Sequence, residues 1–149
     1  MGCDIHSFAE VKTKGNWKKV VEHFSLDDYD KKYYKKDKGN NPFDWRSYAM
    51  FSFLADVKNR GVLKPIAKPK GLPDNLSEEV KNEYEYWKEE GFAASYLTLK
   101  ELLDFDYNKK TIENDTYKNV LGEWFFKHLE ELKLLGESES VRIVFWFDN

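Results

Sequence analysis

Apolar and polar residues alternate at both ends of the chain, which is the period of a strand buried on one face. We therefore predict one strand over Gly2–Lys12 and another over Ser140–Asp148. The C-terminal strand is so apolar that a free edge would favour aggregation, so we expect it to be paired. The N-terminal strand is its natural neighbour. The apolar faces carry Cys3, Ile5, Ala9 and Val11 in the first strand and Val141, Ile143, Phe145 and Phe147 in the last.

Turn residues divide the segment that follows the first strand. A Lys-Gly-Asn turn at positions 14–16 predicts that Trp17–Phe24 returns as the second strand of a hairpin. Ser25–Pro42 is polar and has no clear period, so we predict a long excursion loop there. Prolines at positions 65, 69 and 73 then predict an extended crossing.

Apolar residues spaced three and four apart predict the helices. Thr98 and Glu101 have the spacing of a capping box, which marks the start of a short helix. The predicted helices cover Asp44–Asn59, Ser77–Gly91, a short segment from Thr98, and Asp115–Leu135. We therefore expect one α+β domain over residues 1–149, with a small, mainly antiparallel sheet that pairs the N- and C-terminal strands under three to four helices.

Composition supports a folded domain and limits its partners. The 149 residues are 41% apolar and 17% aromatic, more aromatic than a core requires, so some rings can line a groove or an interface. The net charge of −3 lacks the basic footprint of a general nucleic-acid binder. The Lys- and Tyr-rich segment at positions 31–38 is a local exception, which we interpret as a solvated loop because acidic residues flank it.

Targeting signals and common catalytic motifs are absent from the sequence. Cys3 is the only cysteine, no apolar run approaches a membrane span, and no export signal opens the chain. We therefore expect a cytoplasmic protein without a membrane partner, a metal or a cofactor. A Gly-rich phosphate loop, a Gly-x-Ser-x-Gly elbow and a His-Glu-x-x-His helix are also missing.

Polar residues on the terminal strands are the best candidates for chemistry. Asp4 and His6 are two residues apart and point to the same side, as an acid–base pair or two metal ligands would. Arg142, Trp146 and Asp148 share one side of the last strand, where a guanidinium fork and an indole suit a phosphate and a base. A polar face with only structural ion pairs is the competing interpretation.

Several motifs resemble those of a known family. The chain opens with Met-Gly-Cys-Asp-Ile-His and closes with Val-Phe-Trp-Phe-Asp-Asn. Between them stand Arg-Ser-Tyr at 46–48, Leu-Ala-Asp-Val-Lys-Asn at 54–59, Gly-Leu-Pro at 71–73 and Ser-Tyr-Leu-Thr-Leu-Lys-Glu-Leu at 95–102. The whole chain thereby resembles a family of small proteins encoded by phages, prophages and some bacteria, for which no activity is established.

The resemblance adds candidate residues and one departure. We include six polar residues of the shared motifs as candidate ligand-binding residues: Arg46, Tyr48, Asn59, Ser95, Tyr96 and Thr98. Relatives often carry an Asp-x-His-Ser stretch just before a Trp-Leu-Thr segment, whereas this chain has Gly-Phe-Ala-Ala-Ser at 91–95. If that histidine serves chemistry in relatives, this chain lacks it, which favours a function without catalysis.

These observations lead to three hypotheses about function. The first is a phage-type accessory protein that binds a small nucleotide-like molecule and sequesters a host defence signal in the host cytoplasm. The second is a small hydrolase, with or without a metal, that uses Asp4 and His6. The third is a module that binds a host protein through the Ser25–Pro42 segment. Association of identical copies is left open.

Overall fold

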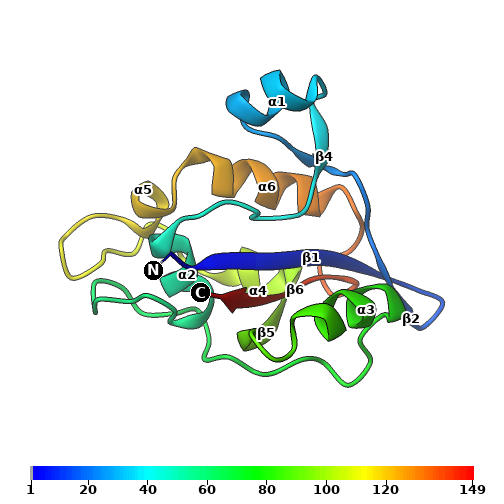
Figure 1. Ribbon diagram of the computed structural model, residues 1–149. Helices are drawn as coiled ribbons and strands as arrows, with labels where there is room; N and C mark the ends of the chain where they lie inside the picture. The colour runs from blue at the N-terminus through cyan, green and yellow to red at the C-terminus, as the bar shows by residue number, and fades with distance from the viewer. Residues whose placement is uncertain (1) are drawn as a thin grey trace.

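The last strand pairs along its full length with the first at the centre of the molecule (Figure 1). The computed structural model describes residues 2–149. Strand β1 (Asp4–Thr13) runs antiparallel to β6 (Val141–Asp148), with Asp4 opposite Asp148 and Val11 opposite Val141. The predicted α+β fold with paired terminal strands is therefore confirmed.

Two further strands complete a four-stranded sheet of order β2-β1-β6-β5. β2 (Asn16–Lys19) forms the predicted hairpin with β1 but ends earlier than predicted. β5 (Phe92–Thr98) pairs with β6 and was not predicted. Only Ser95 and Leu97 are fully buried in β5, which is too short an alternation to indicate a strand.

One face of the sheet carries the large core. Its apolar side chains pack against α2 (Tyr48–Ala55), α4 (Leu99–Asp104) and the helices before β6. Helix α2 begins after Ser47, whose side chain accepts a hydrogen bond from the Met50 N–H, so the predicted start at Asp44 was wrong. Asp44 is thereby free of the helix and lies in the segment before it.

The long helix predicted over Asp115–Leu135 is two helices. α5 (Tyr117–Leu121) and α6 (Glu123–Lys133) are separated by Gly122, whose φ of 84° lies in the left-handed region that favours glycine. The apolar spacing continues across the break because both helices face the same core. The pattern therefore gave the buried face correctly but could not show the interruption.

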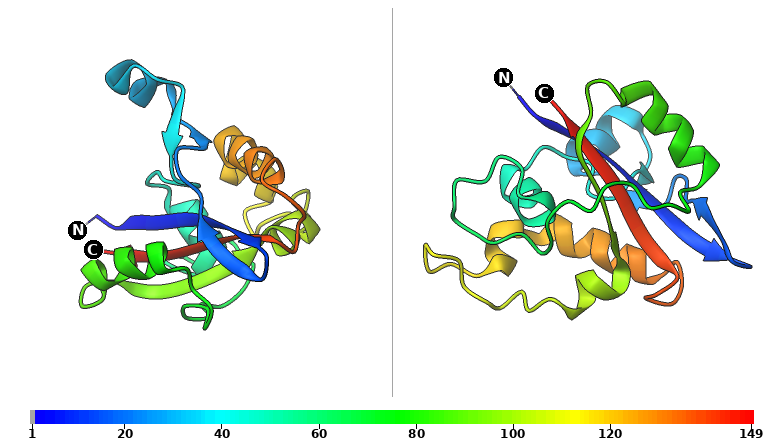
Figure 2. Two further views of the ribbon diagram at one scale, coloured as in Figure 1. Left: turned by 90° about the vertical axis from the view of Figure 1, so that its right-hand side faces the viewer. Right: turned by 90° about the horizontal axis from the view of Figure 1, so that it is seen from below.

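The opposite face of the sheet is covered by α3 (Glu78–Trp87), as Figure 2 shows. A smaller cluster of Phe8, Val80, Val144 and Trp146 lies between this helix and the sheet. Polar groups of the terminal strands lie on this side as well. The sheet is thus a middle layer between helices.

The predicted loop over Ser25–Pro42 contains regular structure. β3 (Phe24–Ser25) pairs with β4 (Lys38–Asn40), and α1 (Asp28–Tyr34) connects them. Asp27 caps α1 at its start, and Lys35 ends it in the left-handed conformation. Figures 1 and 2 show α1 standing away from the sheet, so the absence of an apolar period reflects a helix with no buried face rather than a loop.

Candidate ligand-binding site

A pocket of about 160 Å³ opens between the start of α1, the segment before α2, and α6. Its lining combines aromatic rings with carboxylates: Ser25, Asp27, Asp30, Asp44, Trp45, Trp124 and His128. A concave site with aromatic walls and a few polar groups is the usual form of a small-molecule site. None of these seven residues was among the candidates taken from the sequence.

His128 fixes two walls of this pocket. Its Nδ1 accepts a hydrogen bond from the Phe43 N–H at 3.0 Å, so the proton lies on Nε2, which donates to the Ser25 backbone oxygen at 2.9 Å. Burial lowers the pKa of His128 more than the Ser25 hydrogen bond and the Glu131 charge raise it. The neutral ring thus ties β3 and the segment before α2 to α6, and both its nitrogens are already engaged.

The carboxylate of Asp44 lies in an environment that disfavours its charged form. Burial raises its pKa to about 6; the charges of Asp30 and Asp4 also raise it, whereas His6 lowers it. Among the side chains that the structure describes, none forms a hydrogen bond or an ion pair with this carboxylate. A half-buried acid without a partner reduces stability and is typical of functional sites.

Two more acids add negative charge to the pocket. Asp27 accepts a hydrogen bond from the Asp30 N–H at 2.8 Å as the cap of α1. Burial and the neighbouring charge of Asp27 raise the pKa of Asp30. The lining therefore favours ligands that donate hydrogen bonds or carry positive charge over anions.

The indoles of Trp45 and Trp124 provide the apolar surfaces. Trp45 meets His128 edge to face, with ring centroids 5.0 Å apart. Trp124 is the second residue of α6, and the Lys127 ammonium lies 4.5 Å from its ring centroid. Flat faces of this kind suit a planar or cationic ligand.

Five sequence candidates meet at the end of the sheet where β1 begins and β6 ends. Arg46 donates two hydrogen bonds to Asp4, at 2.9 and 3.0 Å, and thereby lowers the pKa of Asp4. His6 bonds Asp148 at 2.7 Å, and Trp87 of α3 stacks on the imidazole at 4.1 Å. The fifth, Tyr48, accepts a hydrogen bond through its hydroxyl from the Cys3 N–H. Asp4 and His6 therefore each pair with another residue rather than with one another.

The segment before α2 connects this cluster to the pocket. Phe43 is buried and bonds His128, Asp44 and Trp45 line the pocket, and Arg46 reaches Asp4. Because consecutive residues serve both places, the pocket and the terminal cluster form one continuous region.

Arg142 and Trp146 do not present the surface expected of them. The side chain of Arg142 is 4% exposed; its Nε donates to Glu10 at 2.6 Å and its Nη1 to Asn75 at 2.8 Å. Trp146 is fully buried against Phe8 and Tyr84. The expectation of an open fork and a free indole is corrected, because α3 and the segment before it cover this face.

The remaining candidates have structural partners. Thr98 caps α4 in a capping box with Glu101, as the sequence predicted. Ser95 accepts a hydrogen bond from the Lys70 N–H, and the Lys70 ammonium lies 4.9 Å from the Tyr96 ring centroid. Asn59 joins Asp56 to the Leu63 backbone oxygen. These residues lie outside the pocket lining.

Comparison of the chain with protein-family models, curated proteins and solved structures gives no match. The resemblance to phage-encoded proteins therefore stays a prediction. Within residues 2–149, no three His, Cys, Asp or Glu residues are grouped so that they could hold a metal ion. No helix in this part of the chain is long and apolar enough to cross a membrane.

Proposed function

We propose that the protein binds a small nucleotide-like molecule in this pocket and does not transform it. The observation that carries the proposal is the unpaired carboxylate of Asp44 in a pocket walled by Trp45 and Trp124. Stacking on aromatic side chains stabilises a bound base by about 1–3 kcal/mol. A carboxylate beside the rings can accept the N–H groups at the edge of that base.

The size and charge of the pocket narrow the ligand. A volume of about 160 Å³ is close to the roughly 150 Å³ of a cavity that holds benzene, so a single-ring base fits better than a larger group. Carboxylates accept hydrogen bonds but repel oxygen acceptors, which favours cytosine, with its amino group, over uracil. Phosphates would lie outside, where the side chain of Arg46 is 53% exposed.

Two pocket residues that could otherwise serve in catalysis are already engaged in hydrogen bonds, which supports binding without transformation. Both nitrogens of His128 are bonded to the backbone, so this ring cannot serve as a general base. The Ser25 hydroxyl and N–H both donate to Glu131, at 2.6 and 3.1 Å, so this carboxylate serves to hold Ser25 in place. Retention of an intact ligand is therefore the proposed activity; the resemblance to phage proteins motivates sequestration of a host defence signal as its purpose.

Matched nucleosides test the proposal. In calorimetric titrations we expect cytidine and its phosphates to bind, and uridine, which differs at the base edge, to bind at least tenfold more weakly. Asp44→Asn, Trp45→Leu and Trp124→Leu should each weaken binding tenfold or more, while Tyr86→Leu, at an exposed ring outside the pocket, should not. The proposal is wrong if no nucleoside or nucleotide binds at millimolar concentration.

An organic cation is the second candidate ligand. Asp27, Asp30 and Asp44 give the pocket negative charge, and indole rings attract cations through their faces. Agmatine and choline in the same titration distinguish the two classes. Binding of these amines, with no binding of cytidine, would replace the nucleotide-like ligand by a cation.

The hydrolase hypothesis has one supporting observation of its own. Asp148 bonds His6 at 2.7 Å, the arrangement in which a carboxylate orients a histidine for acid–base chemistry. Asp148, rather than Asp4, is the partner in this arrangement. Mass spectrometry after prolonged incubation with bound nucleotides separates the hypotheses. Turnover that disappears in His6→Ala would favour the hydrolase, and intact ligand would favour retention.

A further inference from the structure

Helix α1 exposes a cluster of tyrosines and has no buried residue. Tyr29, Tyr33 and Tyr34 are 75%, 69% and 58% exposed. The rings of Tyr29 and Tyr33 stack with centroids 6.5 Å apart, and Tyr34 meets Tyr33 edge to face at 5.0 Å. Contiguous aromatic rings on a projecting helix are typical of an interaction surface.

The same region carries concentrated positive charge. Residues 31–38 contain five lysines and one aspartate, a net charge of +4 in a chain whose net charge is −3. We call the tyrosines and these residues the basic arm. Its partner surface should therefore be acidic and should offer an aromatic ring.

Helix α3 and the residues after it have the complementary character. Residues 78–90 contain six glutamates and two lysines, a net charge of −4. Tyr86 is 81% exposed there and meets Trp87 edge to face at 5.3 Å. We call residues 78–90 the acidic ridge.

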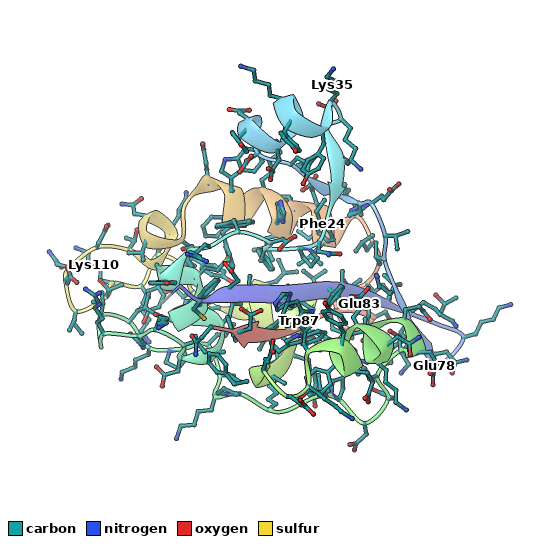
Figure 3. All side chains as sticks on the ribbon, in the orientation of Figure 1. Phe24, Lys35, Glu78, Glu83, Trp87 and Lys110 are labelled. Carbon is teal, nitrogen blue, oxygen red and sulfur yellow. The ribbon has the colours of Figure 1, made fainter. Side chains whose placement is uncertain are left out.

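The basic arm cannot reach the acidic ridge of its own molecule. Figure 3 labels Lys35 on the arm, on one side of the sheet, and Glu78, Glu83 and Trp87 on α3, on the other side. Helices α1 and α3 are also well separated in the views of Figures 1 and 2. The two surfaces can therefore meet only between molecules.

We propose that the basic arm of one copy docks on the acidic ridge of a second copy. Such a contact joins two different surfaces, so each molecule keeps one free surface and the assembly grows into a ring or an open chain. A nucleic acid fits the arm less well, because Asp27, Asp28 and Asp30 stand at its base and the whole chain is acidic. Because exposed charges hold this contact, it should be weak and sensitive to salt. The proposal does not depend on ligand binding.

Charge reversal with rescue tests this contact. We expect sedimentation velocity at 50 mM NaCl to show mass increasing with protein concentration, and at 500 mM NaCl to show monomer. Reversing the arm in Lys32→Glu/Lys35→Glu/Lys36→Glu, or the ridge in Glu85→Lys/Glu89→Lys/Glu90→Lys, should weaken association at 50 mM NaCl at least tenfold. Combining both sets restores complementary charges and should restore association.

A matched control separates this contact from general charge effects. Lys109→Glu/Lys110→Glu/Lys118→Glu changes the net charge equally at exposed positions away from both surfaces, and should associate as the unmodified protein does; Figure 3 labels Lys110. Because α1 buries no residue, the arm variant should keep its thermal midpoint, which confirms folding. Monomer at every concentration at 50 mM NaCl, or failure of the combined variant to associate, overturns the proposal. Binding of a single-stranded oligonucleotide through the arm of a monomeric protein overturns it in favour of a nucleic acid.

Discussion

Glu10 and Arg142 lie directly opposite one another on the two central strands and form a buried ion pair, with 2.6 Å between Oε1 and Nε. The other carboxylate oxygen of Glu10 accepts the Ser77 N–H at 2.9 Å, and Arg142 also donates to Asn75. The pair therefore holds the segment that starts α3 on the sheet. This ion pair accounts for the polar residues on the face of the sheet beneath α3, and no ligand is needed to explain them.

Arg142→Met should destabilise the protein by roughly 3–5 kcal/mol, because it leaves the buried charge of Glu10 without its positively charged partner. Chemical denaturation measures the change. Arg60→Met, at an exposed arginine, is the control and should change stability by less than about 0.5 kcal/mol. Adding Glu10→Leu to Arg142→Met should recover part of the loss. A change below about 1 kcal/mol in Arg142→Met would contradict a structural role for the pair.

Asp44→Asn should stabilise the protein at pH 7 by roughly 1–3 kcal/mol. Burial raises the pKa of Asp44 from 3.8 to about 6, so the folded state binds its proton more tightly than the unfolded state. The unmodified protein therefore loses stability as pH rises through this window, and Asp44→Asn does not. Denaturation across this pH range, with Asp74→Asn at an exposed position as control, measures the difference. A gain in stability together with weaker cytidine binding would show that the acid is kept for the ligand.

Glu131→Gln should destabilise the protein at pH 7 by roughly 1–3 kcal/mol. Burial alone would raise the pKa of Glu131, but hydrogen bonds from the Ser25 hydroxyl and N–H, with nearby positive charge, hold it below its usual value of 4.5. This stabilisation is present above pH 4.5 and is lost as pH falls through the lowered pKa. The two proteins should therefore converge in acid. Glu130→Gln, at a carboxylate that is 69% exposed, should show no such pH dependence.

Two buried serines should respond to the same substitution in opposite ways. The hydroxyl of Ser7 has no hydrogen-bond partner within residues 2–149, so Ser7→Ala should be neutral or stabilising by up to about 1 kcal/mol. The hydroxyl of Ser25 donates to Glu131 at 2.6 Å, so Ser25→Ala should destabilise by about 1–3 kcal/mol. Thermal unfolding of the two variants side by side measures the contrast. Equal destabilisation would mean that Ser7 has a partner in solution.

The fold was predictable wherever a long strand or helix buries one face, because its apolar residues then recur at a regular spacing. The alternation in the terminal strands gave their pairing, and the capping box gave the start of α4 at Thr98. The pattern failed where burial was absent or brief, as in α1, which has no apolar face, and in β5, which buries only two residues completely. It also could not show the break at Gly122, because a turn at a glycine leaves the apolar spacing of its neighbours intact.

The candidate site was less predictable because its residues come from distant segments. Asp44 was predicted to begin a helix and Asp27 to lie in a loop, whereas Asp27 caps α1 and Asp44 precedes α2. His128 follows the apolar spacing of α6, so nothing in the sequence distinguishes it from a core residue. Arg142 and Trp146 were expected at a ligand because no local pattern indicates that α3 covers them. The tertiary fold decides which residues surround these side chains.

The position of β6 has a consequence for the order of folding. This strand lies between β1 and β5, yet it is made after both of them. While the ribosome adds the residues in between, β1 and β5 each have an edge that only β6 pairs in the folded protein. The sheet therefore forms in one late step that joins segments far apart in sequence. Proteins that depend on such a step fold slowly, and their incomplete chains are prone to aggregation.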